Sequence, residues 1–247
     1  MQRLYLGNKD VSTLLKLDGN FVYVPFEENY GPFLDGIQKR FDFGNLESYP
    51  GSGNELYDLA TEGTASMITG ARSEYSTDLG GSYVFGETTR IFQPTGSLSG
   101  TGSYSMVFVF TKADDSTVET IVDSNTDVGR FPKVISYDNG DFLVRFTDGV
   151  EFDNRFDVGF DTGSMLNEWH QLNIVRDEDG GVSASLDNNP LVSTGRVDTG
   201  SADFYIFSNG NAAQSQWSGS MAQMLFYTSS LTNENISQIY NNWSIKQ

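Results

Sequence analysis

The sequence contains no cysteine, which excludes disulfides, thiolate metal sites and cysteine nucleophiles at once. It contains a single histidine, His170, so Ser–His–Asp chemistry is possible only through that residue. No stretch approaches the roughly 18 uninterrupted apolar residues of a membrane-spanning helix. The sequence therefore predicts no thiol chemistry and no helix that crosses a membrane.

Basic residues are also scarce. Lysine and arginine number 15 against 33 aspartates and glutamates, which gives a formal net charge of −18. A chain of this charge repels nucleic acid and anionic membrane surfaces rather than seeking them. We interpret the acidity mainly as a source of solubility, with calcium binding or an acidic environment as the alternatives.

The N-terminus, Met1-Gln-Arg-Leu-Tyr-Leu, lacks the charged-then-apolar plan of a signal peptide. We expect either that the chain is not exported by that route or that a signal was removed. Apolar residues make up 38% and aromatic residues 13%, which is enough for a real core. At 247 residues, the chain has room for one large all-β domain or two ordinary ones.

Most of the chain consists of short strand-like segments separated by turn residues such as Asp138-Asn-Gly-Asp and Asp179-Gly-Gly. The clearest predicted strands are 81–86, 104–110, 120–123, 142–146, 169–176, 182–186, 204–207 and 221–227. Many short strands at close spacing, with almost no helix, predict an all-β fold: a two-sheet antiparallel sandwich of jelly-roll type.

The apolar period changes from about 2 to about 3.6 after residue 231. Ile236, Ile239, Tyr240 and Trp243 fall on one face of a short C-terminal helix. Thr232 is placed to cap this helix, and Leu231 to pack on Ile236 as a hydrophobic staple.

Residues 1–40 differ in pattern from the rest of the chain. Strand-like segments at 3–6, 12–17 and 21–24 are separated by the turns Gly7-Asn-Lys-Asp10 and Asp18-Gly-Asn20, and residues 27–36 resemble a linker. So short a β unit cannot bury much apolar surface alone. We predict that it docks on the main domain or on a partner, and the residues assigned to partner docking are Leu4, Tyr5, Leu6, Leu14 and Leu15.

Four sequence segments resemble known protein families. The segment 217–243, a long strand followed by a turn and a small helix, resembles the end of laminin-G-like and pentraxin-like domains of the concanavalin-A-like superfamily. Residues 43–59 resemble the start of laminin-G-like domains in phage particle proteins, although Ala60-Thr-Glu-Gly-Thr has fewer glycines than the relatives. Residues 168–176 resemble the strand that such domains begin with Trp-His. In addition, residues 4–11 are similar to the start of structural proteins of tailed bacteriophages.

This resemblance implies a division into residues 1–40, an N-terminal β attachment segment and linker, and residues 41–247, a concanavalin-A-like jelly-roll domain. It also implies a binding or structural module rather than an enzyme. We expect a non-enzymatic structural or decoration protein of a tailed-phage virion, present in multiple copies. Its partners would be other capsid or tail proteins and a host-surface glycan, with no nucleic acid and no membrane insertion.

Two alternatives stay open. The first is a carbohydrate-binding or adhesion module of a bacterial secreted or surface protein, and the second is a glycoside hydrolase with a divergent site. Glucanases of the superfamily need two carboxylates on one strand, about 5–5.5 Å apart. No Glu-x-Asp-x-Glu pattern occurs, and the run Asp177-Glu178-Asp179 lies in a predicted turn. We therefore predict no catalytic residue, and we assign Trp169, His170 and Trp217 to the core.

A calcium site is the one cofactor that the sequence leaves open. Phe-Asp pairs repeat at 152–153, 156–157 and 160–161, and hard cations prefer several carboxylate and carbonyl oxygens. The favoured alternative is an acidic edge strand or loop whose charge prevents strand pairing. Many laminin-G-like domains hold calcium at a rim, but no cofactor is expected to be required here.

Overall fold

The computed structural model describes residues 4–6, 9–11, 13–17, 20–24, 36–53, 55–60, 65–69, 74–78, 81–85, 90–93, 102–113, 119–124, 133–136, 141–147, 155–161, 166–196, 204–206 and 217–244. The chain divides into two compact units, Met1–Gly36 and Ile37–Gln247.

The N-terminal unit contains two antiparallel hairpins. The first joins β1 (Leu4–Leu6) to β2 (Lys9–Val11), and the second joins β3 (Thr13–Leu17) to β4 (Asn20–Val24). The strands predicted in this segment are confirmed. Lys9 and Asp10, which the sequence places in a turn, instead belong to β2 because they pair with Leu6 and Tyr5.

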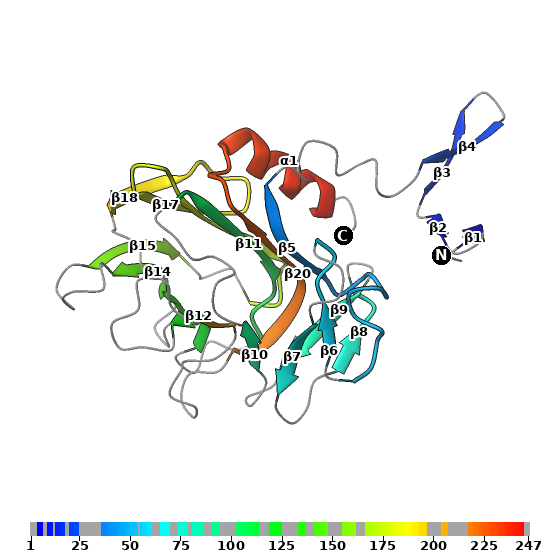
Figure 1. The fold of residues 1–247 in the computed structure, drawn as a ribbon, viewed down its shortest axis with the longest axis horizontal. Coiled ribbons are helices and arrows are strands. Elements are labelled where there is room, and N and C mark those ends of the chain that lie inside the picture. The colour runs from blue at the N-terminus through cyan, green and yellow to red at the C-terminus, as the bar shows by residue number, and fades with distance from the viewer. Residues whose placement is uncertain are drawn as a thin grey trace. The chain divides into compact units, whose positions relative to one another are not determined.

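The larger unit is built from two eight-stranded antiparallel sheets (Figure 1). Sheet 1 has the order β18 (Val192–Arg196), β17 (Gly181–Leu186), β16 (His170–Arg176), β11 (Tyr104–Phe110), β20 (Gly219–Tyr227), β9 (Ser82–Phe85) and β8 (Glu74–Ser76), and β5 (Ile37–Asp42) also pairs with β20. Sheet 2 has the order β15 (Arg155–Asp161), β14 (Asp141–Thr147), β13 (Lys133–Ser136), β12 (Glu119–Ser124), β19 (Phe204–Ile206), β10 (Arg90–Gln93), β7 (Ala65–Thr69) and β6 (Glu55–Tyr57).

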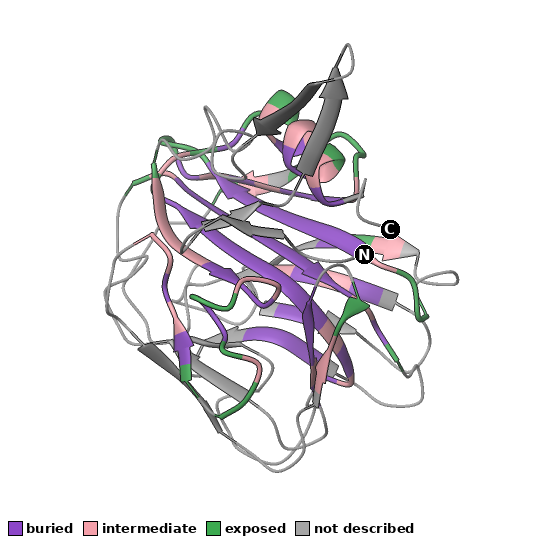
Figure 2. Cartoon of the chain, turned by 90° about the vertical axis from the view of Figure 1, so that its right-hand side faces the viewer, coloured by how far each residue is buried: buried purple, intermediate pink, exposed green. Residues whose placement is uncertain are grey.

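The core lies between the sheets, and aromatic rings join them. Phe110 of β11 stacks on Phe142 of β14 with a centroid distance of 5.9 Å, and meets Trp217 edge-on at 5.2 Å. Trp217 is 0% exposed, as predicted for a core residue. The central strands β11 and β16 are buried along their whole length, because one face meets sheet 2 and the other lies under the C-terminal segment. Figure 2 shows that buried residues are concentrated in strands in the middle of the molecule.

The single described helix, α1 (Asn233–Ser244), covers part of the outer face of sheet 1 (Figure 1). Its predicted cap is confirmed: the Thr232 hydroxyl accepts the Asn235 backbone N–H at 3.2 Å, and the Asn235 side-chain oxygen accepts the Thr232 N–H at 3.0 Å. Ile236, Ile239 and Trp243 are buried on the predicted face. No helix in the part of the chain described is both long and apolar enough to cross a bilayer.

The predicted boundary at residue 40 falls inside β5. This strand pairs antiparallel with β20, for example Phe41 with Met224 and Arg40 with Leu225. Residues 37–40 therefore lie in the sandwich rather than in the linker, because β20 has an open side there for another strand. The attachment role of the N-terminal segment stays a prediction.

Residues 155–161 of the acidic segment considered for calcium form β15, at the end of sheet 2, and residues 152–154 lie outside the described residues. β15 pairs with β14, which sets Asp157 opposite Arg145. Val158 is buried, so the strand is anchored by apolar residues. The all-β sandwich with one short C-terminal helix is thus confirmed. β15 lies at the edge of sheet 2, as the acidic-edge-strand interpretation expects, and the calcium alternative stays a prediction.

Candidate functional site

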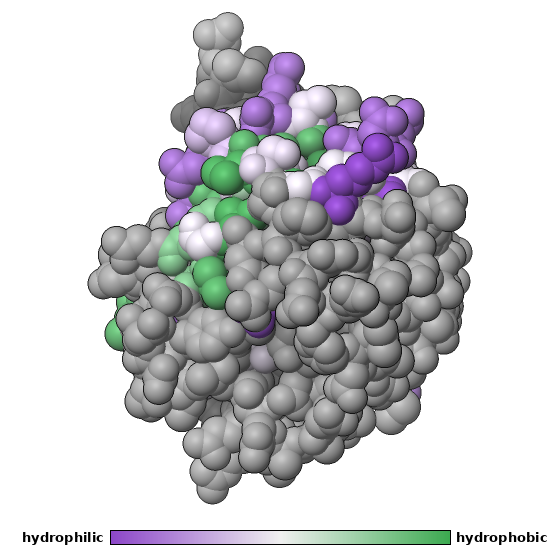
Figure 3. All heavy atoms as spheres, turned by 90° about the vertical axis from the view of Figure 1, so that its left-hand side faces the viewer, coloured by the Kyte–Doolittle hydropathy of each residue, from purple (hydrophilic) through white to green (hydrophobic). Residues whose placement is uncertain are grey.

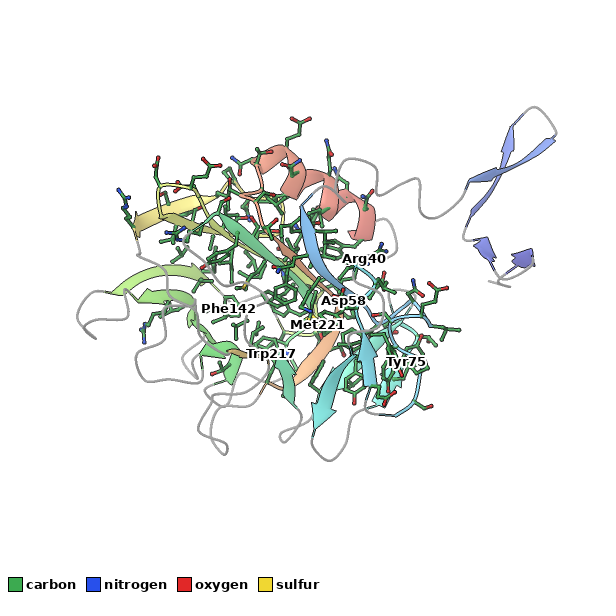
Figure 4. The ribbon with its side chains drawn as sticks, viewed as in Figure 1. Arg40, Asp58, Tyr75, Phe142, Trp217 and Met221 are labelled. Atoms are coloured by element: carbon green, nitrogen blue, oxygen red, sulfur yellow. The ribbon has the colours of Figure 1, made fainter. Side chains whose placement is uncertain are left out.

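The segment 43–59 has a structural role: it covers the outer edge of β5. The Asp58 carboxylate accepts the backbone N–H groups of Arg40 and Ala60, both at 2.9 Å, and the Leu59 N–H donates to the Arg40 carbonyl at 2.8 Å. Figure 4 shows Arg40 beside Asp58. Lys39 adds an ion pair to the same carboxylate at 3.5 Å. Asp58 and Leu59 therefore satisfy edge groups that a neighbouring strand would otherwise pair.

The first half of this segment is joined to β5 and β6 by buried hydrogen bonds. Ser48 accepts the Asp42 N–H at 3.1 Å and donates its hydroxyl to the Tyr57 carbonyl at 2.8 Å. Asp42 in turn accepts the side-chain amide of Gln223 at 3.0 Å. Gly51 and Gly53 have φ values of +82° and +90°, as the predicted tight turn requires. These hydrogen bonds give the first half of the segment a structural role.

His170 resembles half of a catalytic triad. Its Nδ1 lies 2.9 Å from a carboxylate oxygen of Asp187, and its side chain is 9% exposed. The other ring nitrogen, Nε2, is buried and has no hydrogen-bond partner. A general base must reach its substrate within hydrogen-bond distance. This imidazole is closed to a substrate, so the predicted structural role fits the geometry.

The acidic run before Gly180 has a turn geometry. Asp177, Glu178 and Asp179 are exposed, and the Asp177 carboxylate accepts the Gly181 N–H at 2.7 Å. No group of three or more histidine, aspartate or glutamate side chains suited to a metal occurs among the residues described. Asp153 lies outside those residues, and the calcium site stays a prediction.

Trp169 differs from its predicted place in the core. It is only partly buried, and it packs with Tyr240 against a small cluster of Val109, Ala222 and Trp243 outside the main core. Alternation along β16 explains this: His170, Leu172 and Ile174 belong to one face, so Trp169 and Gln171 belong to the other. That alternation is readable in the sequence, but the size of the tryptophan points to the core instead.

Three segments meet around Trp169: the loop 166–169, the loop 187–190 and the end of α1 from Tyr240 to Trp243. We call them together the Trp169 corner. β16 begins where β17 ends, which brings the two loops together, and the last turn of α1 is tied to β16 by the Trp243 indole N–H, which donates to the Gln171 side chain at 2.6 Å. The two loops also contain exposed polar residues: Asn167, Glu168, Asn188 and Asn189.

The Asp187 carboxylate is held rigidly in this corner. One oxygen contacts His170 Nδ1, and the other accepts the Gln171 backbone N–H at 2.9 Å, yet the side chain remains 25% exposed. Burial, and to a smaller degree the nearby Asp187 charge, raises the pKa of the Tyr240 hydroxyl. A tyrosine hydroxyl is protonated near neutral pH even without this shift, so it can act as a hydrogen-bond donor.

The backbone is also unusual in this corner. Asn167 and Asp187 have φ values of +60° and +57°, and among the residues described they are the only non-glycines with positive φ. Asparagine and aspartate adopt this left-handed conformation more readily than other non-glycine residues, so both mark tight turns in the two loops of the Trp169 corner. The grouping of Trp169 and Tyr240 with the held Asp187 carboxylate makes this corner the candidate functional site.

The predicted docking residues lie in the other unit. Leu4, Tyr5 and Leu6 form β1, and Leu14 and Leu15 lie in β3. Their side chains lie outside what the structure describes, so their role stays a prediction. In the described sandwich, large exposed apolar side chains are limited to Leu46, Leu166 and Val192. On the face in Figure 3, described apolar residues form a narrow band bordered by hydrophilic ones.

No protein-family model and no curated protein matches the chain. Solved structures of botulinum neurotoxin binding domains share its fold. The receptor-binding domain of the C/D mosaic serotype aligns with a TM-score of 0.66 and 15% identity over 85% of this chain and 52% of that one. A serotype D/C binding domain gives 0.63 and 11% over 85% and 53%, and a type C structure gives 0.61 and 11% over 87% and 53%. The chain thus spans about half the length of these neighbours, and at such identities the likeness concerns the fold alone.

Proposed function

We propose that this chain is a non-catalytic, lectin-like binding module whose sandwich presents a glycan-binding site. The observation that carries the proposal is the Trp169 corner, where the partly exposed rings of Trp169 and Tyr240 pack on one small cluster, the nearby Asp187 carboxylate is held by His170 and Gln171, and the imidazole of His170 is buried. Aromatic faces with a few convergent polar groups are a common form of small-ligand site.

The structural neighbours support this choice by analogy. Cell entry of botulinum neurotoxin type C depends on interaction with two ganglioside molecules. The binding domain of the type DC neurotoxin was solved in complex with SialylT. Another was solved with rat synaptotagmin II, so that domain also binds a protein. A shared fold does not fix function. The analogy adds only that such sandwiches occur in receptor-binding proteins.

The finer part of the proposal concerns location. We place the protein on a tailed-phage particle, in multiple copies, held on capsid or tail proteins by the hairpins of residues 1–24. The support is the phage-like phrase at 43–59 and the separation of Met1–Gly36 as its own unit. A carbohydrate-binding module of a bacterial secreted or surface protein remains the second candidate, because the Trp169 corner would serve it equally well.

A glycan array probed with the full chain and with residues 37–247 tests the proposal. Both chains should bind the same glycans, because the site lies in the sandwich, and binding should survive EDTA because no cofactor is required. Neither chain should release reducing sugar from a bound glycan. Absence of binding to every glycan would refute the lectin-like function, and hydrolysis abolished by one Asp or Glu substitution would refute the non-catalytic part.

Mass spectrometry of purified particles tests the location. The protein should be found at many copies per particle. Removal of residues 1–36 should abolish its incorporation without changing glycan binding. Detection only as part of a larger bacterial polypeptide would favour the second candidate.

A further inference from the structure

We infer that the Trp169 corner binds an uncharged sugar ring, with Trp169 as the stacking surface and Asp187 and Tyr240 as hydrogen-bonding partners, and that it disfavours sialylated or otherwise anionic glycans. This inference rests on the proposed function and names its site and ligand class.

The first support is the supply of polar partners. A sugar ring presents apolar C–H faces and a rim of hydroxyl groups, so it needs an aromatic surface beside donors and acceptors. Asp187 supplies carboxylate oxygens that accept from hydroxyls, the protonated Tyr240 hydroxyl can donate, and the amides of Asn167 and Asn188 can do both.

The second support is rigidity. The Asp187 carboxylate is fixed by His170 and by the Gln171 backbone, and the Asn173 side-chain amide donates to the Asp187 carbonyl at 3.4 Å. Tyr240 meets the buried Trp243 ring edge-on at 5.0 Å. Groups that are already held in place lose little conformational freedom when a ligand binds, which favours a weakly interacting ligand such as a sugar.

The third support concerns charge. Neither of the two loops nor α1 contains a lysine or an arginine within its described residues. Lys112 lies beside the first loop and its carbonyl accepts the Asn167 N–H at 2.7 Å, but its side chain is fully buried. Glu168 and Asp187 add acidic side chains, and the whole chain has a net charge of −18. An anionic sugar would therefore meet like charge, and none of the described residues of these three segments offers a cation to pair with it.

A matched pair of ligands tests the inference: a lactose-terminated oligosaccharide and the same oligosaccharide capped with sialic acid, titrated into ¹⁵N-labelled full-length protein. The protein has three tryptophans, hence three indole N–H signals. The Trp217 indole is buried in the main core and donates to the Thr111 carbonyl, so its signal should not move and serves as the internal control. The Trp169 signal, identified by its loss in Trp169→Phe, should shift on titration with the neutral ligand. The sialylated ligand should bind at least about tenfold more weakly.

Alanine substitutions test the same site by glycan affinity, with a control variant that removes a similar aromatic side chain elsewhere. Trp169→Ala and Tyr240→Ala should each weaken neutral-glycan binding at least about tenfold, as for other central aromatic contacts. Tyr57→Ala is the control and should leave glycan binding unchanged, because Tyr57 is a partly exposed aromatic residue of β6 in the other sheet.

The outcomes separate the inference from the function on which it rests. Glycan binding that leaves the Trp169 signal unmoved and survives both substitutions would overturn the inference and keep the lectin-like function. A stronger response to the sialylated ligand would overturn the ligand class. Failure of every array glycan to bind would refute the proposed function itself.

Discussion

Gln171 joins the C-terminal helix to the sheet, and its replacement by leucine is the sharpest test of how the Trp169 corner is built. Its side-chain oxygen accepts the Trp243 indole N–H at 2.6 Å, and its amide donates to Asn173 at 2.7 Å and to the Ile236 carbonyl at 3.3 Å. Gln171 and Asn173 are 0% exposed, and Trp243 is 2% exposed. Water therefore has no access to the groups that Gln171→Leu would leave unpaired.

The expected loss follows from those groups. Leucine is close to glutamine in size, so the substitution removes hydrogen bonds with little change in volume. A buried polar group without a partner costs about 1–3 kcal/mol. Two such groups, the Trp243 N–H and the Asn173 oxygen, predict a loss of about 1–5 kcal/mol in the free energy of unfolding once the gain from a buried leucine is subtracted.

A double-mutant cycle isolates the link between helix and sheet. Trp243→Phe removes the donor, so in the Gln171→Leu, Trp243→Phe protein the indole N–H is no longer orphaned. The double variant should therefore lose about 1–2 kcal/mol less than the sum of the single variants. Urea unfolding followed by circular dichroism measures all four proteins, and equal m-values confirm a common denatured state. Losses that add to within about 0.5 kcal/mol would refute the argument, since independent residues behave in that way.

Three further predictions concern the sandwich. A chain that begins at Ile37 should unfold cooperatively in urea, whereas one that begins at Asp42 should aggregate or melt early because it loses β5; equal stability of the two would contradict the pairing of β5 with β20. Trp217→Ala should lower the free energy of unfolding by about 3–5 kcal/mol, and a loss below about 1 kcal/mol would place this ring outside the core. Burial raises the pKa of the Tyr104 hydroxyl above that of an unfolded tyrosine, so its contribution to stability is present below about pH 10 and is lost as the pH rises further, by up to about 1.4 kcal/mol per pH unit. Tyr104→Phe should flatten that alkaline slope in urea titrations, and an unchanged slope would contradict the assignment.

The spacing of apolar residues in the sequence was enough to predict the strands and the helix whose apolar residues recur at a regular period. The alternation in 142–146 predicted β14, and the spacing of Ile236, Ile239 and Trp243 predicted α1 and its buried face. Both signals are legible because an element with one face on a core repeats its apolar residues at its own period. The turn glycines Gly51 and Gly53 were also predicted, since a left-handed backbone favours glycine.

Tertiary structure decided which segments lie together. β5 has no clear alternation, and the predicted domain boundary at residue 40 falls inside it, yet it becomes a strand because β20, far away in the sequence, has an open edge beside it. Asp58 carries no local sign of its role, which depends on Arg40 lying opposite it.

The candidate site depended on the same kind of information. The chain shows Trp169, Asp187 and Tyr240 as three separated residues, and nothing in their local sequence links them. Sheet register brings the ends of β16 and β17 together, and the Gln171–Trp243 hydrogen bond brings the helix to them. Local sequence thus determined the period and the buried face of each element, because those depend on near neighbours. The meeting of three distant segments was decided only by the tertiary structure, because it depends on how strands pair and what covers them.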